Sequence, residues 1–330
     1  MARSWPHLRR TRRDARRRAF DHGCASPSDE GLPSGQARRT GVGAVARPSA
    51  WPYNAAGAQR FRCVVIRLHD GTREADLSRC IAIANQKGGS GKTTTTRSLA
   101  AALAERGRRV LLVDLDPQAS LSEGSGLELH RLENTTYHVL IGSARLQNVI
   151  VPIEERVDLA PANIHLAAAE LQLVNMNRRE DKLRNALKPV RDQYDYVLID
   201  CPPSFGLLTV NALSAADSVL IPMACDYYTM LGVRLLLDTV REIQSEVNPE
   251  LTIEGLLPTR FDARTLHARE ILEQTRTALG GGVRVFDTVV RESVRFKESP
   301  ITGRSILSYA SGSAGARAYR TLAEEIDRRD

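Results

Sequence analysis

The 330-residue chain lacks the features that mark membrane, secreted and zinc-binding proteins. It has no run of about 18 or more apolar residues, which excludes an ordinary membrane-spanning helix. Its five cysteines are scattered and form no CxxC pair, so neither a disulfide framework nor a zinc site is indicated. The arginine-rich N-terminus is not followed by an apolar segment and is therefore not a secretory signal. These absences favour a cytoplasmic protein with reduced cysteines.

Lysine is also absent from the first 80 residues, where the basic charge is concentrated. This segment contains 16 Arg against 7 Asp or Glu, which gives +9. The formal net charge of the whole chain is +7, so the other 250 residues carry −2. Those residues could bind a nucleic acid only through a local basic patch.

Residues 1–76 differ in composition from the rest of the chain. They are rich in Arg, Pro, Gly, Ala and Ser and show no sustained apolar period. Such a segment buries too little apolar surface to offset its ordering entropy, so we expect it to be disordered. Two interpretations stay open. The segment is either a basic arm that adds DNA affinity, or translated upstream DNA preceding a true start near Leu77.

Residues 77–330 have the pattern of a single α/β domain. Short apolar runs alternate with longer helical stretches, which predicts a doubly wound, mostly parallel sheet with helices on both faces. We expect strands at residues 80–84, 110–113, 157–160, 196–199, 219–222 and 253–257. We expect helices at residues 93–105, 166–174, 182–190, 231–247, 266–279 and 315–326. Ligands of such sheets bind beyond the carboxyl ends of the strands.

A glycine-rich loop lies between the first strand and the first helix. It reads Gln86-Lys87-Gly88-Gly89-Ser90-Gly91-Lys92-Thr93-Thr94. Its glycines let backbone N–H groups wrap phosphates, and the helix N-terminus adds partial positive charge. In this P-loop, Lys92 is expected to reach the β- and γ-phosphates, and the Thr93 hydroxyl to bind Mg²⁺. The fold class is then a P-loop NTPase, and residues 87–94 bind the nucleotide.

Two strands end in acidic residues. Asp114 and Asp116 follow the second apolar strand, and their spacing predicts that both point toward the nucleotide. Asp200 ends another apolar strand, as expected for a Walker B residue that holds Mg²⁺. Cys201 follows Asp200, but without a second suitably spaced cysteine an iron–sulfur site is not indicated.

The loop departs from a strict Walker A pattern, because Gln86 stands in place of the first glycine and Lys87 adds a second lysine. This form resembles the deviant Walker A of the ParA/MinD superfamily, and residues 80–330 resemble ParA/Soj partitioning ATPases. The resemblance implies ATP and Mg²⁺ as ligands and an ATP-dependent homodimer in which Lys87 contacts the partner's ATP. It also implies that Asp116 positions the attacking water and Asp114 supports the metal. Lys87, Lys92 and Asp116 are thus the expected catalytic residues.

The same resemblance implies partners for the chain. These are non-specific double-stranded DNA, with a nucleoid-associated location, and a ParB-type centromere-binding protein that stimulates hydrolysis. Arg264, Arg295 and Lys297 lie in loops that resemble DNA-backbone-binding segments, although surface arginines in ion pairs are an open alternative. Arg291 and Ser293 stand where the Soj pattern has Pro and Asn near the purine, which leaves the adenine contacts open.

Three other functions deserve comparison. A MinD-like membrane-associated division-site ATPase would need a basic amphipathic C-terminal helix, whereas residues 318–330 alternate in charge. An iron–sulfur carrier would need paired cysteines. A P-loop transferase is disfavoured by Lys87. The cargo, whether chromosome, plasmid or another structure, and the identity of the partner protein do not follow from the sequence.

Overall fold

The computed structural model describes residues 78–225, 229–279 and 282–328. These residues belong to one compact unit, Arg60–Asp330. The extension predicted at residues 1–76 lies outside the described residues.

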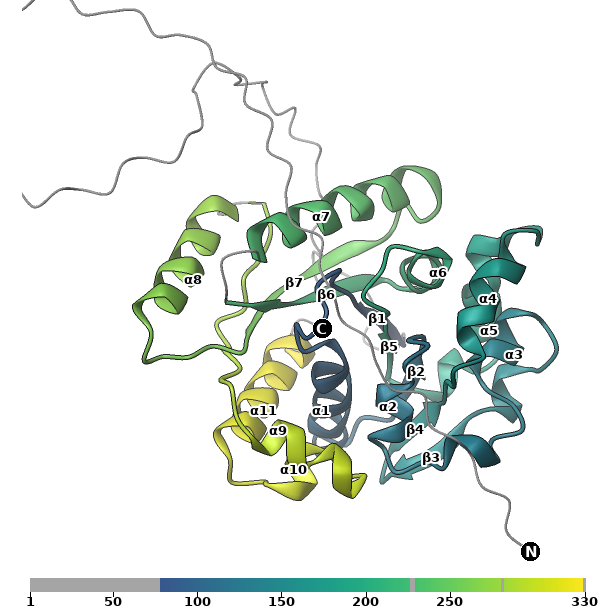
Figure 1. Cartoon of the computed structure of the whole chain (residues 1–330), viewed down its shortest axis with the longest axis horizontal. Helices are drawn as coiled ribbons and strands as arrows, with labels where there is room; N and C mark the ends of the chain where they lie inside the picture. The colour runs from purple at the N-terminus through teal and green to yellow at the C-terminus, as the bar shows by residue number, and fades with distance from the viewer. Residues whose placement is uncertain (1–77, 226–228, 280–281, 329–330) are drawn as a thin grey trace, which may run out of the picture. The chain divides into compact units, whose positions relative to one another are not determined.

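The centre of the domain is a seven-stranded sheet with the order β3-β4-β2-β5-β1-β6-β7 (Figure 1). Its strands are β1 (Arg79–Ile83), β2 (Val110–Asp114), β3 (Val151–Glu154), β4 (Val157–Ala160), β5 (Tyr196–Asp200), β6 (Ser218–Ala224) and β7 (Thr252–Thr259). All neighbouring strands pair in parallel except β3, which is antiparallel to β4. The carboxyl ends of the six parallel strands therefore meet at one edge of the sheet.

Helices cover both faces of the sheet. They are α1 (Lys92–Glu105), α2 (Ser120–Glu123), α3 (Thr136–Leu140), α4 (Leu166–Leu173), α5 (Lys182–Leu187), α6 (Leu207–Ala215), α7 (Thr229–Glu246), α8 (Leu266–Leu279), α9 (Arg295–Glu298), α10 (Ile306–Tyr309) and α11 (Ala314–Asp327). In Figure 1, α1, α10 and α11 lie on one side of the sheet and α6 and α7 on the other. No helix of the described residues is long and apolar enough to span a membrane.

Two hydrophobic cores result from the alternation of side chains along the strands. Ile81 and Ile83 of β1 belong to the core beneath α1 and α11, whereas Cys80 and Ala82 belong to the core beneath α4–α7. All five residues of β1, of β2 and of β5 are buried, because helices cover both faces of each strand. Continuous apolar runs such as Val110–Val113 are the sequence signature of this arrangement.

The predicted fold class is confirmed, with differences in detail. Gly107 lies just beyond α1 in the left-handed conformation (φ 88°), which is common for a glycine after a helix end. The helix expected at residues 182–190 ends earlier, at Leu187, and α6 and β3 are not among the predicted elements. Residues of α6 are buried on nearly all sides, so the helix has no polar face to produce a 3.6-residue period. Strand β3 is a short edge strand interrupted by Pro152.

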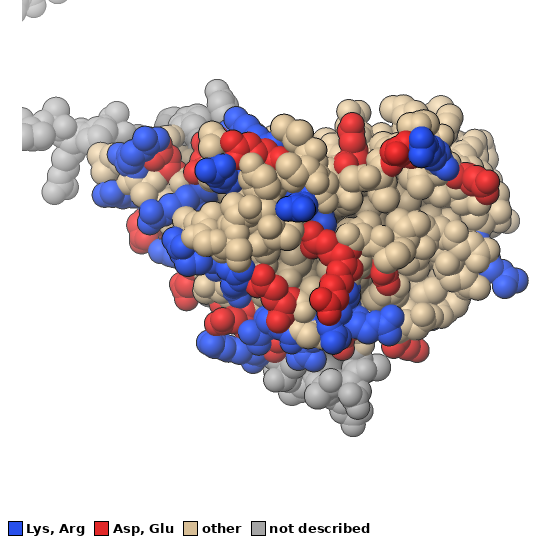
Figure 2. Space-filling view, turned by 90° about the horizontal axis from the view of Figure 1, so that it is seen from below, with Lys and Arg blue, Asp and Glu red and all other residues tan. Residues whose placement is uncertain are grey.

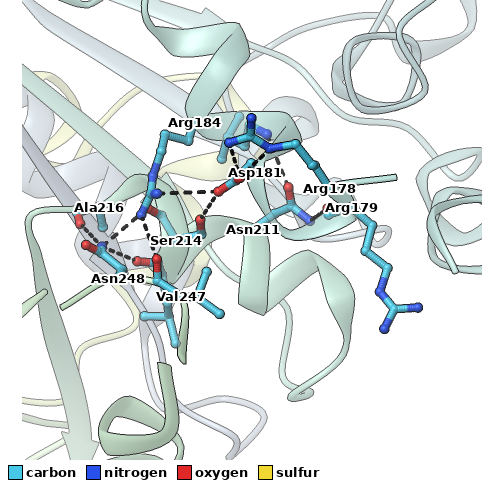
Figure 3. Close-up of polar contacts among 11 residues, drawn as sticks. Arg178, Arg179, Asp181, Arg184, Asn211, Ser214, Ala216, Val247 and Asn248 are labelled. Atoms are coloured by element: carbon cyan, nitrogen blue, oxygen red, sulfur yellow. Dashed lines mark hydrogen bonds and ion pairs between the residues drawn. The ribbon is translucent and has the colours of Figure 1, made fainter. Parts of the chain in front are cut away.

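A polar network joins α5, α6 and the end of α7 (Figure 3). The Asn248 side-chain amide donates to the carbonyl oxygens of Leu213, Ser214 and Ala216 at 3.0, 3.3 and 2.8 Å. These carbonyls belong to the C-terminal end of α6, where the helix itself supplies no donors. The Arg184 Nε atom also donates to the Ser214 carbonyl, at 2.6 Å. The network therefore fixes α6, whose other end leads to the nucleotide edge of the sheet.

Candidate nucleotide-binding site

A cleft of about 540 Å³ lies at the carboxyl edge of the parallel strands. Its walls come from the loops that follow β1, β2, β5 and β7 and from the segment 290–300. These segments are far apart in sequence, and the parallel sheet places their strand ends together. The cleft is therefore where a doubly wound fold is expected to bind its ligand.

The glycine-rich loop forms one wall of the cleft. Gly89 and Gly91 have φ angles of 71° and 94°, a left-handed region that favours glycine. Gly91 is the N-cap of α1, so the loop delivers the chain directly into the helix. The Ser90 side chain is buried, and its Oγ atom has no hydrogen-bond partner among the described residues. The loop thus has the conformation of a phosphate-binding cradle.

Lys92 lines the cleft at the start of α1. Its side chain is buried, and the Nζ atom lies 3.5 Å from the Lys87 carbonyl oxygen. Burial lowers the pKa of Lys92, although the charges of Asp200, Cys201 and Asp116 act in the opposite direction. A buried ammonium is stabilised by a nearby anion, and a bound phosphate would supply one.

Asp200, at the end of β5, is fully buried near this lysine. Its Oδ1 atom accepts a hydrogen bond from the Thr96 hydroxyl at 3.4 Å, while Oδ2 has no partner among the described residues. Burial and the charge of Asp114 raise the pKa of Asp200, and the Thr93 hydroxyl and Lys92 oppose this shift. Carboxylate and hydroxyl oxygens are ligands that Mg²⁺ accepts. The unpaired oxygen of Asp200 close to Thr93 therefore fits the predicted magnesium ion.

Asp114 and Asp116 face different surroundings. Asp116 lines the cleft and its Oδ1 atom accepts a hydrogen bond from the Gln118 N–H at 2.9 Å. Asp114 is fully buried; its carboxylate accepts hydrogen bonds from the Asp116 N–H, the Ser122 N–H and the Ser122 hydroxyl. Burial raises the pKa of Asp114 to about 6 in spite of these donors. Of the two carboxylates, Asp116 alone lines the cleft, and the roles of both residues toward the nucleotide and the metal stay predictions.

Lys87 is half-buried in the first part of the loop and does not line the cleft. Its backbone N–H donates to the Asn85 Oδ1 atom at 2.9 Å, and the Asn85 amide donates to the Pro222 carbonyl at 2.7 Å. Asn85 thereby attaches the loop to β6, a contact that joins segments far apart in sequence and has no local signal. Whether Lys87 reaches a second subunit stays a prediction.

Comparisons with known proteins identify the family. A model described as an AAA domain matches residues 78–253. The sporulation initiation inhibitor protein Soj of Bacillus subtilis is 45% identical over 251 residues, which are 76% of this chain and 98% of Soj. The chromosome partitioning protein ParA of Myxococcus xanthus is 44% identical over 257 residues, or 78% of this chain and 90% of ParA. The chain belongs to the ParA/Soj family.

Solved structures of similar proteins agree with the P-loop ATPase fold. A cobyrinic acid a,c-diamide synthase from Mycobacterium smegmatis, crystallised with an ATP analog and magnesium, aligns with a TM-score of 0.68 and 39% identity. The alignment covers 76% of this chain and 95% of that one. The cell division ATPase MinD of Pyrococcus furiosus aligns with a TM-score of 0.63 and 27% identity, covering 77% and 100%.

The segment 290–300 forms the opposite wall of the cleft in this ParA/Soj domain. Arg291, Ser293 and Lys297 line the cleft, so the structure places both predicted purine-side residues at its rim. Phe296, Thr259 and Arg260 also line it, and sequence reasoning does not single them out. No sequence motif surrounds Arg260. It lines the cleft because β7 ends beside the glycine-rich loop, which is a feature of the fold and not of the local sequence.

The three predicted DNA-binding residues do not lie together. Arg264 and Lys297 line a second cleft of about 490 Å³, whereas Arg295 lines a separate hollow beside Tyr309 and Ser311. Arg264 is ion-paired with Asp262 at 2.9 Å and Arg295 with Glu298 at 2.9 Å. On the face shown in Figure 2, basic side chains are similarly interspersed with acidic ones. Such exposed pairs are weak, so the arginines remain available to phosphates.

Proposed function

We propose that this chain is an ATP-driven switch that partitions DNA. ATP joins two copies of the chain around the bound nucleotides, and the dimer binds double-stranded DNA without sequence preference. Hydrolysis, stimulated by a ParB-type partner, opens the dimer and releases the DNA. The observation that carries the proposal is the phosphate-binding loop, with buried Lys92 lining the cleft and the unpaired oxygen of Asp200 buried near this lysine.

Residues in the cleft and around it have different parts in ATP binding and hydrolysis. The glycine-rich loop and the N-terminus of α1 hold the phosphates, and Lys92 places its charge against them. Thr93 and Asp200 would hold Mg²⁺, and Asp114 would support them. When bound, Mg²⁺ neutralises phosphate charge. Asp116, which lines the cleft, orients the attacking water, and Lys87 reaches the nucleotide of the partner subunit, as an arginine finger does.

DNA binding follows from basic residues in the second cleft and on the surface beside it. Arg264 and Lys297 line the second cleft, and Arg295 lies on the neighbouring surface. Guanidinium groups pair with phosphate oxygens without reading bases, which gives affinity without sequence preference. Binding of this kind releases counterions, so affinity should fall steeply with rising salt. In the cell the ATP-bound form would then be cytoplasmic and associated with the nucleoid.

The Asp116→Ala variant tests the hydrolysis step. We expect it to bind ATP without hydrolysing it and to accumulate as a dimer on DNA. Light scattering measures the dimer, and anisotropy of a labelled DNA duplex measures binding, both with Mg²⁺ and ATP. A variant that stays monomeric with ATP would refute the role proposed for Asp116.

The Arg295→Glu variant tests the DNA surface. We expect DNA binding to be lost while ATP-dependent dimerisation is kept. Arg241→Glu is the matched control, because Arg241 also forms an exposed ion pair three residues away, with Asp238 at 2.7 Å, on α7. Loss of both dimer and DNA binding in Arg295→Glu alone would make Arg295 a structural residue.

A MinD-like membrane function is the alternative, and the C-terminal helix bears on it. Tyr319, Leu322 and Ile326 of α11 are buried in the core that α11 shares with α1. The apolar face of α11 is thus occupied by the domain, whereas a membrane-binding helix must offer that face to lipid. Sedimentation with anionic liposomes in the presence of ATP would distinguish the two functions.

A further inference from the structure

The turn at the end of β7 contacts the phosphate loop twice. The Thr259 hydroxyl donates to the Ser90 carbonyl at 2.7 Å. The next residue, Arg260, donates from its guanidinium to the Gly89 carbonyl at 3.3 Å. Two adjacent residues of one turn therefore hold two adjacent residues of the loop that is proposed to bind phosphates.

Arg260 has an unusual backbone for its residue type. Its φ angle is 50°, in the left-handed region that non-glycine residues seldom adopt. Such a conformation persists where surrounding contacts impose it, and it is found preferentially at functional sites. Arg260 also lines the nucleotide cleft directly.

The same turn is attached on its other side to the segment 290–292. The Arg260 guanidinium lies 3.5 Å from a carboxylate oxygen of Glu292. The Phe261 N–H donates to the Val290 carbonyl at 3.2 Å, and the Glu292 N–H donates to the Phe261 carbonyl at 3.4 Å. The turn is thus a short bridge between the phosphate loop and this segment.

The segment reached by the bridge forms a wall between two clefts. Arg291, Glu292, Ser293 and Lys297 line both the nucleotide cleft and the second cleft that contains Arg264. A shift of this wall changes both clefts together. Glu292 also places a negative charge in a cleft proposed to receive phosphates, and Arg260 is the cation that faces it.

We propose that Arg260 is a positioning residue that couples the phosphate loop to the basic cleft. Because Arg260 contacts both the Gly89 carbonyl and Glu292, a change in the loop on nucleotide binding is transmitted to the wall that carries Arg291 and Lys297. This inference rests on the proposed function, since it assumes that nucleotide raises affinity for DNA. Coupling of this kind requires two sites and a connecting element that both sites bias.

The test is the ratio of DNA affinities with and without a non-hydrolysable ATP analogue and Mg²⁺. The variant is Arg260→Asn, because asparagine tolerates the left-handed conformation but lacks the guanidinium. A labelled DNA duplex is the probe. We expect the ratio to fall about 5-fold or more, the lower end of common coupling strengths.

Arg156→Asn is the matched control. Arg156 also has a left-handed backbone, with φ 61°, and its guanidinium donates to a glycine carbonyl, that of Gly107, at 3.2 Å. It lies in the turn between β3 and β4 and lines neither the nucleotide cleft nor the second cleft. The ratio should therefore stay at its wild-type value.

Glu292→Gln provides a second variant that leaves Arg260 in place. Removing the charge of Glu292 should raise DNA affinity in both nucleotide states, whereas Arg260→Asn should lower it. In both variants the ratio of DNA affinities with and without the analogue should fall. A simple charge effect would move both states equally and leave the ratio unchanged. A wild-type ratio in either variant overturns the coupling. If the wild type itself shows no gain with the analogue, the proposed DNA function fails instead.

Discussion

Two regions of this domain bury polar groups in opposite ways. In the network of α5–α6–α7, Asn211 accepts from the Leu183 N–H and donates to the carbonyls of Arg179 and Leu207, while Asn248 donates three hydrogen bonds. At the nucleotide edge, Ser90 Oγ and Asp200 Oδ2 are buried without partners among the described residues.

Polar groups of the α5–α6–α7 network stabilise the fold, whereas the unpaired atoms at the nucleotide edge are suited to binding a ligand. A buried polar atom without a hydrogen bond lowers stability, so one that persists in a native protein calls for an explanation. For Ser90 and Asp200 at the nucleotide edge, the proposed binding of phosphate oxygens and Mg²⁺ is that explanation. Substitutions in the two regions should therefore affect different properties: activity at the cleft and stability in the network.

The largest effect is expected for Lys92→Ala. Loss of a preorganised charge at a reacting phosphate lowers kcat/KM for ATP by about 100- to 1,000-fold. The melting temperature without nucleotide should change little by comparison, and stabilisation by Mg²⁺ and ATP should disappear. Phosphate release and thermal melting with and without nucleotide measure the two effects. Lys182→Ala, on α5, is a control that should keep the wild-type kcat/KM and the stabilisation by Mg²⁺ and ATP.

Asn248→Ala should have the converse effect. It removes three buried hydrogen bonds, and of the three carbonyl oxygens at the end of α6 that of Ser214 keeps its donor, Arg184. The free energy of unfolding should fall by about 2–4 kcal/mol. For a domain of this size that corresponds to a fall of roughly 5–15 °C in the melting temperature. ATPase activity per folded molecule, measured well below the transition, should be unchanged. A normal melting temperature together with lost activity would reverse the roles assigned to the two regions.

The parts of this molecule that the sequence predicts are those with local causes. Strands β2 and β5 are continuous apolar runs ending in aspartate, and the phosphate loop is a contiguous motif, so both are visible without tertiary information. The fold class and the phosphate loop at the cleft follow from them.

The parts that the sequence does not predict depend on contacts across the fold. The Asp114 carboxylate accepts from Ser122 of α2, eight residues along the chain, and Arg260 reaches Gly89 only because β7 ends beside the phosphate loop. Arg264 follows β7 and Arg295 begins α9, and the fold places the two arginines in different hollows. No local pattern encodes such placements.

Gly206→Ala tests a third buried polar atom, which lies between the two regions. Gly206 precedes α6, and a Cβ atom there would lie 2.0 Å from the Glu170 Oε1 atom, which is buried without a partner among the described residues. The φ angle of Gly206 is −81°, so its backbone accepts alanine. Because the obstructing atom is the end of a flexible side chain, Glu170 can shift, and we expect the free energy of unfolding to fall by only about 1 kcal/mol, the low end of overpacking costs.

The double variant Gly206→Ala/Glu170→Ala separates a clash from a ligand role. Truncating Glu170 removes the obstructing carboxylate, so the double variant should recover most of the lost stability in chemical denaturation. Glu170→Ala alone should hydrolyse ATP normally, since Glu170 does not line the cleft. A strong loss of ATPase activity in that single variant would place Glu170 with the ligand-binding atoms after all.

The smallest effect is expected for Asp327→Asn, at the end of α11. Asp327 accepts hydrogen bonds from Arg106 at 2.8 Å, Arg108 at 3.0 Å and the Tyr196 hydroxyl at 3.1 Å. Burial alone would raise the pKa of Asp327, but the bond from Arg106, the charge of Arg108 and the remaining donors outweigh it, so the pKa lies below its ordinary value. Because the arginines are partly exposed, the carboxylate contributes only about 1 kcal/mol.

The sign of this contribution gives a pH test. A lowered pKa in the folded state means that the stabilisation is fully present above the unfolded value of about 3.9 and is lost as the pH falls through the folded value. The wild type should therefore be more stable than Asp327→Asn at neutral pH, and the difference should vanish in strong acid. Urea denaturation at several pH values measures it. A difference that stays constant down to the lowest pH would mean that Asp327 acts through packing, so that even this partly exposed network is held by shape and not by charge.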